Sequence, residues 1–273
     1  MTTAIVEPTL TRQPWRGTGI GRQIVILTGR SLRALISDPK LVIFSVLQPL
    51  IMLLLFSQVF SSIAQTASFP AGVTYINYLM PAILITTGVG ASLQSGIGLV
   101  TDMKNGVLAR LRSLPLDSSS VLVARGLSDL IRTAIQLVIL LTAAVVLFDF
   151  SPTGGLTGVL FAFLLALAVS WSLSWVFIAV GTWLRNAESM QSLGFLAMFP
   201  LMFASSAFVP LDGMPGWLRV IATVNPLTYA VDASRNLALA MPVGSGVVAA
   251  LALAAGLTVV GIVTAVRGFK RPL

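Results

Sequence analysis

Long apolar segments separated by short polar ones are the dominant pattern of this chain. Apolar stretches of about 20 residues recur along it, and a helix of that length crosses the roughly 30 Å hydrocarbon layer of a bilayer. This pattern predicts an all-α, polytopic membrane protein with a single membrane domain over residues 1–273. We place six transmembrane helices at 41–60, 76–100, 130–148, 156–180, 193–209 and 247–266, between an N-terminal segment at 1–40 and a tail at 267–273.

The segment before the first span has a different pattern. When residues 19–37 are wound as a helix, most apolar side chains fall on one arc and the basic ones on the opposite arc. Asp38-Pro39 then gives a stop signal. These features predict an amphipathic helix lying on the membrane surface. Its apolar arc consists of Ile20, Ile24, Val25, Leu27, Leu32, Leu35 and Ile36, and its polar arc of Arg22, Gln23, Arg30 and Arg33.

The loop between the fifth and sixth spans is rich in apolar residues but contains several prolines, so it cannot form one straight helix. Asn225 is a good N-cap and Pro226 suits the first helical position, so we expect a helix to restart there and run towards Ala240. Two short re-entrant helices in the outer leaflet fit this pattern if they pack against the main spans. A partly ordered external loop is the alternative.

Lys and Arg residues predict the orientation. They concentrate before the first span, between spans two and three, between spans four and five, and after span six, whereas the loops at 61–75 and 149–155 contain none. We expect the protein in the inner (plasma) membrane of the cell. The positive-inside rule then places both termini in the cytoplasm. Only Arg219 and Arg235 fall on the predicted outer side.

Composition agrees with a membrane protein and excludes several functions. Hydrophobic residues make up 56% of the chain and charged residues 10%, which is unlike a soluble domain. The net charge of +8 comes from basic residues scattered between apolar spans, so nucleic-acid binding is not indicated. There is no Cys and no His, so thiol nucleophiles, imidazole relays and the usual soft metal sites are missing. We predict no catalytic residues and no metal site.

Two further sequence features bear on the energy source. The chain contains no G-x-x-x-x-G-K-[ST] nucleotide-binding loop, so an ATPase, if one is used, is a separate protein. An ion-coupled secondary transporter would need ionisable groups near mid-membrane, and the central parts of the spans have none. The nearest candidates are Arg125, Asp129 and Arg132, which we place in the cytoplasmic first turns of span three. A secondary transporter and an embedded lipid-modifying enzyme remain as rival classes.

Uncharged polar and aromatic side chains within the spans are candidates for a translocation path. They can hydrogen-bond between helices, which is the ordinary reason for such residues, or line a route for an amphiphile. The candidates for the path are Gln48, Gln94, Gln136, Phe199, Phe203 and Ser205.

The cytoplasmic segment between spans two and three has apolar residues at helical spacing, at Met103, Val107, Leu111 and Leu114. A short helix with such a stripe offers a docking surface, which a pump without its own ATPase requires. A plain polar connector is the alternative.

Two segments resemble a known family. The segment 203–239, FASSAFVPLDGMPGWLRVIATVNPLTYAVDASRNLAL, closely resembles the region after span five in type-2 ABC transporter permeases, particularly the daunorubicin-resistance and complex-lipid export branch. The segment TDMKNGVLARLRSLPLDSSSVLVARGLSDL is similar to that branch's loop between spans two and three. The resemblance implies a dimer with an identical or related second permease, clasped by two copies of a separate ATP-binding subunit. ATP and Mg would be bound by that partner, and this chain would bind no cofactor.

The resemblance also assigns roles to residues by family position. Asp102 stands where family members often carry Glu, and three serines replace the usual basic residue after the Leu-Pro motif. The residues implied in ATPase coupling are Asp102, Met103, Lys104, Gly106, Val107, Leu108, Arg110, Leu111, Arg112 and Leu114. Those implied in an outer-leaflet gate are Pro215, Trp217, Asn225, Pro226, Tyr229, Asp232 and Arg235, although Asp232 and Arg235 equally fit a simple exposed ion pair.

The function predicted from these features is that of the membrane-spanning permease of an ATP-driven exporter. Its cargo would be a hydrophobic or amphipathic molecule, such as a drug or a complex lipid, because uncharged spans do not carry highly charged cargo cheaply. Export of a glycan or lipid-linked polymer is the alternative within the family. Membrane lipids are expected partners, and nucleic acid is not.

Overall fold

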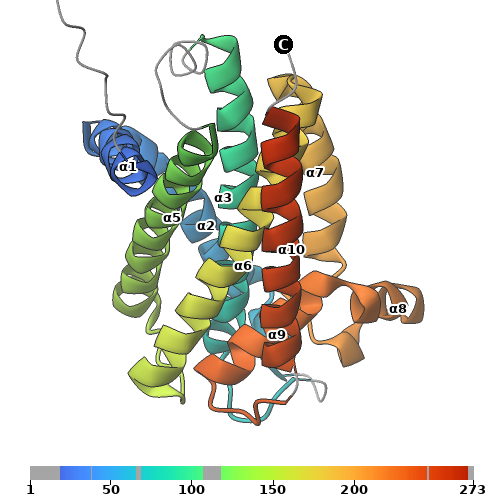
Figure 1. The fold of residues 1–273 in the computed structure, drawn as a ribbon. Coiled ribbons are helices and arrows are strands. Elements are labelled where there is room, and N and C mark those ends of the chain that lie inside the picture. The colour runs from blue at the N-terminus through green and yellow to red at the C-terminus, as the bar shows by residue number, and fades with distance from the viewer. Residues whose placement is uncertain (1–18, 38, 66–68, 107–117, 245, 270–273) are drawn as a thin grey trace, which may run out of the picture.

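The computed structural model describes residues 19–37, 39–65, 69–106, 118–244 and 246–269, and every regular element in these ranges is helical. The long helices run side by side as a bundle (Figure 1). They are α2 (Pro39–Val59), α3 (Tyr75–Lys104), α5 (Ser118–Phe148), α6 (Gly155–Leu184), α7 (Ala187–Phe203) and α10 (Gly246–Phe269). The remaining elements are α1 (Ile20–Ser37), α8 (Gly216–Val224), α9 (Pro226–Ala238) and the short 3₁₀ turns η1 (Ser61–Gln65) and η2 (Leu211–Gly213).

Four of the long helices, α3, α5, α6 and α10, are long and apolar enough to cross a membrane. The other two predicted spans correspond to α2, whose apolar part is shorter, and to α7, which does not meet the apolar criterion. The described apolar part of α2 is Ile43–Val59, and α7 has 17 residues, which is about 25 Å of helix. The all-α, multi-pass architecture is therefore confirmed, and four of the six spans meet the length criterion.

Helix α6 is the centre of the bundle because small residues let two neighbours approach it closely. On α3, a Cβ atom added at Gly96 would lie 2.7 Å from the Phe177 carbonyl oxygen of α6. On α10, a Cβ atom added at Gly261 would lie 2.8 Å from the Cβ of Trp175, again on α6. Such contacts between backbones are how membrane helices gain packing energy without a hydrophobic driving force between them.

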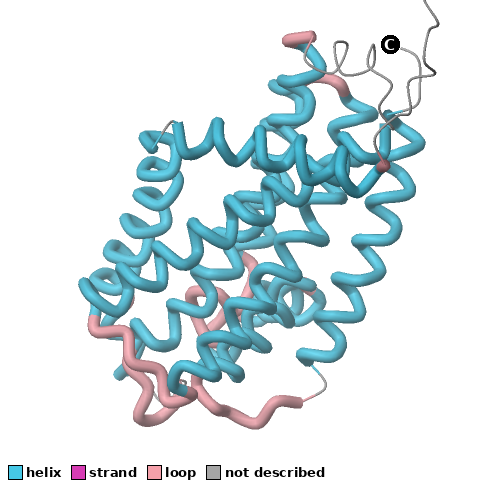
Figure 2. Tube along the Cα trace, turned by 60° about the vertical axis from the view of Figure 1, so that its left-hand side comes forward, coloured by secondary structure: helices cyan, strands magenta, loops and turns pink. Residues whose placement is uncertain are grey.

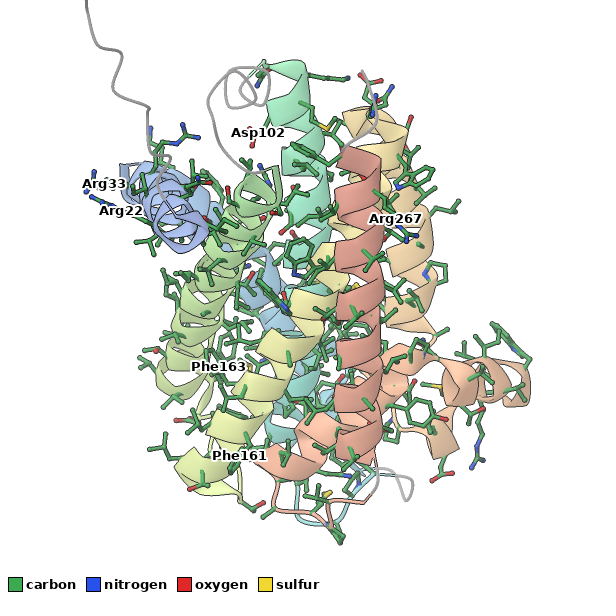
Figure 3. The ribbon with its side chains drawn as sticks, in the orientation of Figure 1. Arg22, Arg33, Asp102, Phe161, Phe163 and Arg267 are labelled. Carbon is green, nitrogen blue, oxygen red and sulfur yellow. The ribbon has the colours of Figure 1, made fainter. Side chains whose placement is uncertain are left out.

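The two ends of the bundle differ. Most loop residues gather at one end (Figure 2), where α8 also extends sideways from the bundle (Figure 1). Asp102, near the last turn of α3, lies towards the opposite end, as do Arg22 and Arg33 on α1 and Arg267 on α10 (Figure 3). We call these the loop end and the basic end.

Several predicted boundaries need correction. The fifth span was predicted at 193–209, but α7 begins at Ala187, where the Asn186 side chain accepts hydrogen bonds from the backbone N–H groups of Glu188 and Ser189. It ends at Phe203, so Ser205 lies beyond it. The third span was predicted to begin at residue 130, but α5 begins at Ser118, and Ser120 near its start donates a hydrogen bond to Gln23 of α1.

The predicted faces of α1 are also partly wrong. Gln23, predicted on the polar arc, is buried, and its side-chain oxygen accepts a hydrogen bond from Ser120 of α5 at 2.9 Å. Val25, predicted on the apolar arc, is 70% exposed. Helix α1 therefore packs on α5 through its polar residues Gln23 and Thr28 as well as through Leu27.

Candidate functional site

Two polar clusters, one at each end of the bundle, hold the residues that the sequence singled out. The loop-end cluster joins α9 to α3 and α7, and the basic-end cluster joins α3 to α5. Each contains buried polar side chains, Arg235 and Asn225 in the first and Asp129 in the second, and a buried polar group needs a partner.

In the loop-end cluster, Asn225 occupies the break between α8 and α9 and is itself buried. Its side-chain oxygen accepts a hydrogen bond from the Leu227 N–H at 2.9 Å, which confirms the predicted N-cap. Its amide nitrogen donates to the carbonyl oxygens of Leu201 at 2.7 Å and Ala204 at 2.6 Å. Asn225 therefore starts α9 and also holds that start against the end of α7.

Arg235 is the centre of the loop-end cluster and is only 5% exposed. Its Nε donates to the Tyr78 carbonyl oxygen of α3 at 3.1 Å, its Nη1 to Asp232 Oδ1 at 2.7 Å, and its Nη2 to the Ser206 carbonyl oxygen at 2.8 Å. The guanidinium carbon also lies 3.6 Å from the centre of the Tyr78 ring, in cation–π contact. The interpretation of Asp232 and Arg235 as a simple exposed pair is therefore wrong.

The rest of the loop-end cluster surrounds this arginine. Ser206 donates from its hydroxyl to Asp232 Oδ1 at 2.6 Å, and the Tyr75 hydroxyl donates to the Phe208 carbonyl oxygen at 3.0 Å. Sequence reasoning missed Tyr75 and Tyr78. Their spacing of three at the start of a membrane helix is a signal that they share one face near the membrane interface.

The other predicted gate residues are on the outside of this cluster. Pro215 directly precedes α8, and Trp217 on α8 is 70% exposed. Tyr229 on α9 is half exposed and donates from its hydroxyl to the Thr223 carbonyl oxygen at 2.8 Å, across the break between the two helices. The two predicted short helices are therefore present, with Pro226 at the start of the second.

The basic-end cluster consists of charged side chains from α3 and α5. Arg125 of α5 donates from Nη1 to Asp102 Oδ2 of α3, and its Nε lies 3.7 Å from Asp129 Oδ2 on its own helix. Arg132 Nη2 lies 3.7 Å from Asp129 Oδ1. Arg125 lies about two turns inside α5, so these three residues fall in the first third of that helix, where Arg125 reaches α3.

The predicted ATPase-coupling segment is described only in part. Met103 and Lys104 belong to the last turn of α3, and Gly106 follows with a φ of +71°, a conformation that ends a helix. Asp102, predicted in the same group, is paired within this chain. The remaining residues of the prediction, Val107, Leu108, Arg110, Leu111, Arg112 and Leu114, lie outside the described residues.

The residues predicted to line a path do not form one site. Gln136 donates to the Ser45 carbonyl oxygen of α2 at 2.7 Å, so it serves helix packing. Ser205 is buried and donates to the Met202 carbonyl oxygen at 2.6 Å. Gln48 on α2 and Gln94 on α3 are exposed, as are Phe199 and Phe203 on α7.

A row of aromatic rings connects α7 to the loop end. Ring centres are 4.5 Å apart between Phe199 and Phe203, 5.3 Å between Phe203 and Phe208, and 4.6 Å between Phe208 and Phe56 of α2. A cavity of about 210 Å³ lies beside this row under the start of α8, and its lining includes Pro215 and Leu218. Offset and tilted rings at these distances favour apolar and aromatic contact.

A second apolar cavity, of about 360 Å³, lies on another side of α7. Its wall is formed by apolar residues of α3, α6, α7, α9 and α10, including Met198, Leu201, Leu227 and Leu253. Among the described residues no group of three or more His, Cys, Asp or Glu side chains could hold a metal ion.

Comparison with known proteins assigns the family. The model of the ABC-2 type transporter family matches residues 22–239. The chain is 31% identical over 225 residues to the daunorubicin resistance ABC transporter permease protein of Streptomyces coeruleorubidus. The aligned residues cover 82% of this chain and 77% of that protein. It is 26% identical over 249 residues to a probable doxorubicin resistance ABC transporter permease protein of Mycobacterium tuberculosis, covering 91% and 88%.

A putative transport permease of Cyanophora paradoxa is 32% identical over 220 residues, covering 79% of this chain and 74% of that protein. The matched residues 22–239 run from α1 to the end of α9 and contain every described residue of both polar clusters. The chain is therefore a multi-pass membrane protein that belongs to the ABC-2 type transporter permease family.

Proposed function

We propose that this chain is the membrane-spanning subunit of an ATP-driven exporter, which moves a hydrophobic or amphipathic molecule out of the cytoplasm or the inner leaflet. Two relatives are named as drug-resistance permeases, which supports export of apolar compounds. ATP and Mg are bound by a separate ATP-binding subunit, present in two copies, and this chain contributes no catalytic residue, cofactor or metal. Family membership favours this mechanism over an ion-coupled transporter.

The proposed topology has six spans in one membrane domain over 1–273, with α2 and α7 completing the set. The basic end faces the cytoplasm, and so do both termini. The grouping of Arg22, Arg33 and Arg267 at the end where Asp102 lies supports this orientation (Figure 3). The loop end, with α8 and α9, then faces outward in the inner membrane.

The observation that carries the proposal is the attachment of α9 to the long helices at the loop end. Arg235 and Asn225 attach α9 to α3 and α7 through charged and amide hydrogen bonds that are shielded from water. Such bonds are strong when satisfied and costly when broken, so they define a closed state with discrete contacts. We propose that α8 and α9 are the outer-leaflet gate, with Asp232 and Arg235 as its lock.

The proposed path lies along the surface shared by α2, α3 and α7. Gln48 on α2, Gln94 on α3, and Phe199 and Phe203 on α7 are each exposed in one chain, and we propose that a second permease, identical or related, encloses them. The row of rings from Phe199 to Phe56 ends beside α8, so it leads towards the proposed gate. Gln136 and Ser205 are left out of this path because their side chains are engaged in helix contacts.

The proposed docking surface for the ATP-binding subunit is the segment 105–117, which connects α3 to α5 and lies mostly outside the described residues. Helix α3 ends and α5 begins at the basic end, and Gly106 has the positive φ that ends a helix. Asp102 differs from the rest of the predicted coupling group, because its carboxylate is engaged with Arg125.

Reconstitution tests the proposal. The permease would be placed in vesicles with and without its co-purifying ATP-binding subunit, and movement of a lipophilic fluorescent drug would be followed. We expect transport only with the subunit and ATP. Transport driven by a proton gradient without ATP would overturn the proposal, and ATP-dependent movement of a lipid-linked glycan but of no small lipophile would support the alternative cargo.

A further inference from the structure

Arg125 has two carboxylates within reach, on two different helices. Its Nη1 donates to Asp102 on α3, and Asp129 lies one turn further along its own helix, at a spacing that lets the two side chains meet. The side chain of Arg125 is 21% exposed and that of Asp129 is 12% exposed, so neither charge is fully hydrated. An arginine in this position needs an anionic partner at all times.

The contact with Asp129 is incomplete. Arg125 Nε and Asp129 Oδ2 are 3.7 Å apart, beyond hydrogen-bond distance, and both atoms are buried without a hydrogen-bond partner among the described residues. A small rotation of the Arg125 side chain towards Asp129 would satisfy both atoms at once. Asp129 is thus a reserve partner, held close to the arginine while Asp102 is engaged.

The contact with Asp102 depends on a matching feature of α3. Gly98 lies one turn before Asp102 on the same helix, and a Cβ atom added there would overlap the Arg125 guanidinium. The missing side chain at residue 98 makes room for the arginine, and the carboxylate at residue 102 binds it. Helix α3 therefore presents a receptor for Arg125 within its last two turns, formed by Gly98 and Asp102.

This receptor is placed at the start of the loop that leads from α3 to α5. Asp102 precedes the end of α3 by two residues, and Arg125 follows the start of α5 by seven. Any force on the intervening loop, 105–117, therefore acts on the two helices that this ion pair joins. Separation of the helix ends must break the Asp102 contact before it can spread along the bundle.

We infer that Arg125 is a positioning residue that exchanges carboxylates during the transport cycle, from Asp102 when α3 and α5 are joined to Asp129 when they part. The inference rests on the proposed function for its trigger, which is docking of the ATP-binding subunit at the loop. Because Arg125 then pairs with Asp129, the helices separate without leaving its buried charge unpaired. The two alternative ion pairs of Arg125 define two discrete states of the contact between α3 and α5.

Spin labels test the exchange in the permease alone. The chain has no Cys, so labels can be attached at Lys104→Cys on α3 and Ile135→Cys on α5, both exposed positions. Asp129→Asn removes the reserve partner, so the joined state and a single short label distance should dominate. Asp102→Asn removes the partner on α3, so the population at longer distance should rise at least tenfold. Asp212→Asn, in the exposed pair with Arg219, is the control and should change nothing.

Transport supplies the second measurement. With the ATP-binding subunit in vesicles, Asp129→Asn should keep normal subunit binding and slow transport about tenfold, whereas Asp102→Asn should keep ATP hydrolysis and lose the coupled transport. Asp129→Asn with wild-type distances and wild-type transport would overturn the exchange. If the label distances change as described but no ATP-dependent transport occurs with wild-type protein, the proposed function fails and the exchange stands.

Discussion

Single buried polar residues decide how the helices of this permease are held together. Arg235 uses its three nitrogens on three different partners, in α3, in α9 and in the segment after α7. Asn225 uses both ends of its amide, one for the start of α9 and one for α7. Such hydrogen bonds matter in a bilayer, because burying apolar surface between helices there gives little free energy of association.

Replacing Arg235 by Lys should destabilise the loop end. Lys keeps the positive charge, but its single ammonium cannot reproduce the planar set of contacts that Arg235 makes with Tyr78, Asp232 and Ser206. We expect a loss of about 1–3 kcal/mol, reduced from the value for a fully buried pair because the Asp232 side chain is 39% exposed.

Thermal unfolding in detergent would measure this effect. The control is Arg219→Lys, because that residue pairs with Asp212 on the surface, where an ion pair contributes about 1 kcal/mol or less. Equal melting temperatures for Arg235→Lys and Arg219→Lys would contradict the assignment of Arg235 as the lock.

At the scale of whole elements, the close approach of helices to α6 sets the bundle. Gly261 on α10 faces Trp175 of α6 with no room for a side chain, whereas Gly256 on the same helix has nothing within 4 Å of an added Cβ. Two glycines five residues apart therefore have opposite roles. Only the helix packing distinguishes them, because the surrounding sequence is apolar in both cases.

Gly261→Ala should therefore destabilise the protein and Gly256→Ala should not. The added methyl at residue 261 would force α10 away from α6, and overpacking of this kind costs about 1–3 kcal/mol. At residue 256, alanine should be neutral or stabilise by up to about 1 kcal/mol, because it is the better helix former. Unfolding by a denaturing detergent would compare the two, and a larger loss at residue 256 would refute this account of the α6–α10 contact.

The loop at 105–117 gives a second prediction at this scale. Val107→Asp and Leu111→Asp together would place carboxylates on the proposed docking surface, where an unpaired buried charge costs several kcal/mol. We expect normal membrane levels and at least a tenfold loss of binding to the ATP-binding subunit, measured by co-purification. Ser113→Asp is the control within the same loop. If the double variant co-purifies with the ATP-binding subunit as well as the wild-type protein does, the segment is a plain connector and not a docking surface.

At the scale of the whole molecule, the two ends should be exposed on opposite sides of the membrane. Asn105 at the basic end and Gly244 at the loop end are both exposed, and the chain has no Cys of its own. With Cys placed singly at each position, a membrane-impermeant thiol reagent added to intact cells should label residue 244 and leave residue 105 unlabelled. The topology is inverted if the opposite result is obtained.

Much of the fold could be predicted from the sequence because lipid imposes strong rules on it. Apolar length predicted the long helices, Asn225-Pro226 predicted the start of α9, and two segments identified the family. Helix boundaries at 118 and 187 were not predicted, because polar residues there are satisfied by neighbouring helices or by a cap rather than by water. Hydropathy along the chain does not contain that information.

The sequence by itself determined that this protein is a helical membrane protein, since apolar length and local cap chemistry are properties of consecutive residues. Its resemblance to known permeases, carried by two segments, indicated the family. Only the tertiary structure decided how its charges are used. It showed that Arg235 is buried against Tyr78, that Asp102 belongs to Arg125, and that Gln136 bonds α2. These pairs join residues from different helices, and their contacts arise from the way the helices pack, which no local pattern specifies.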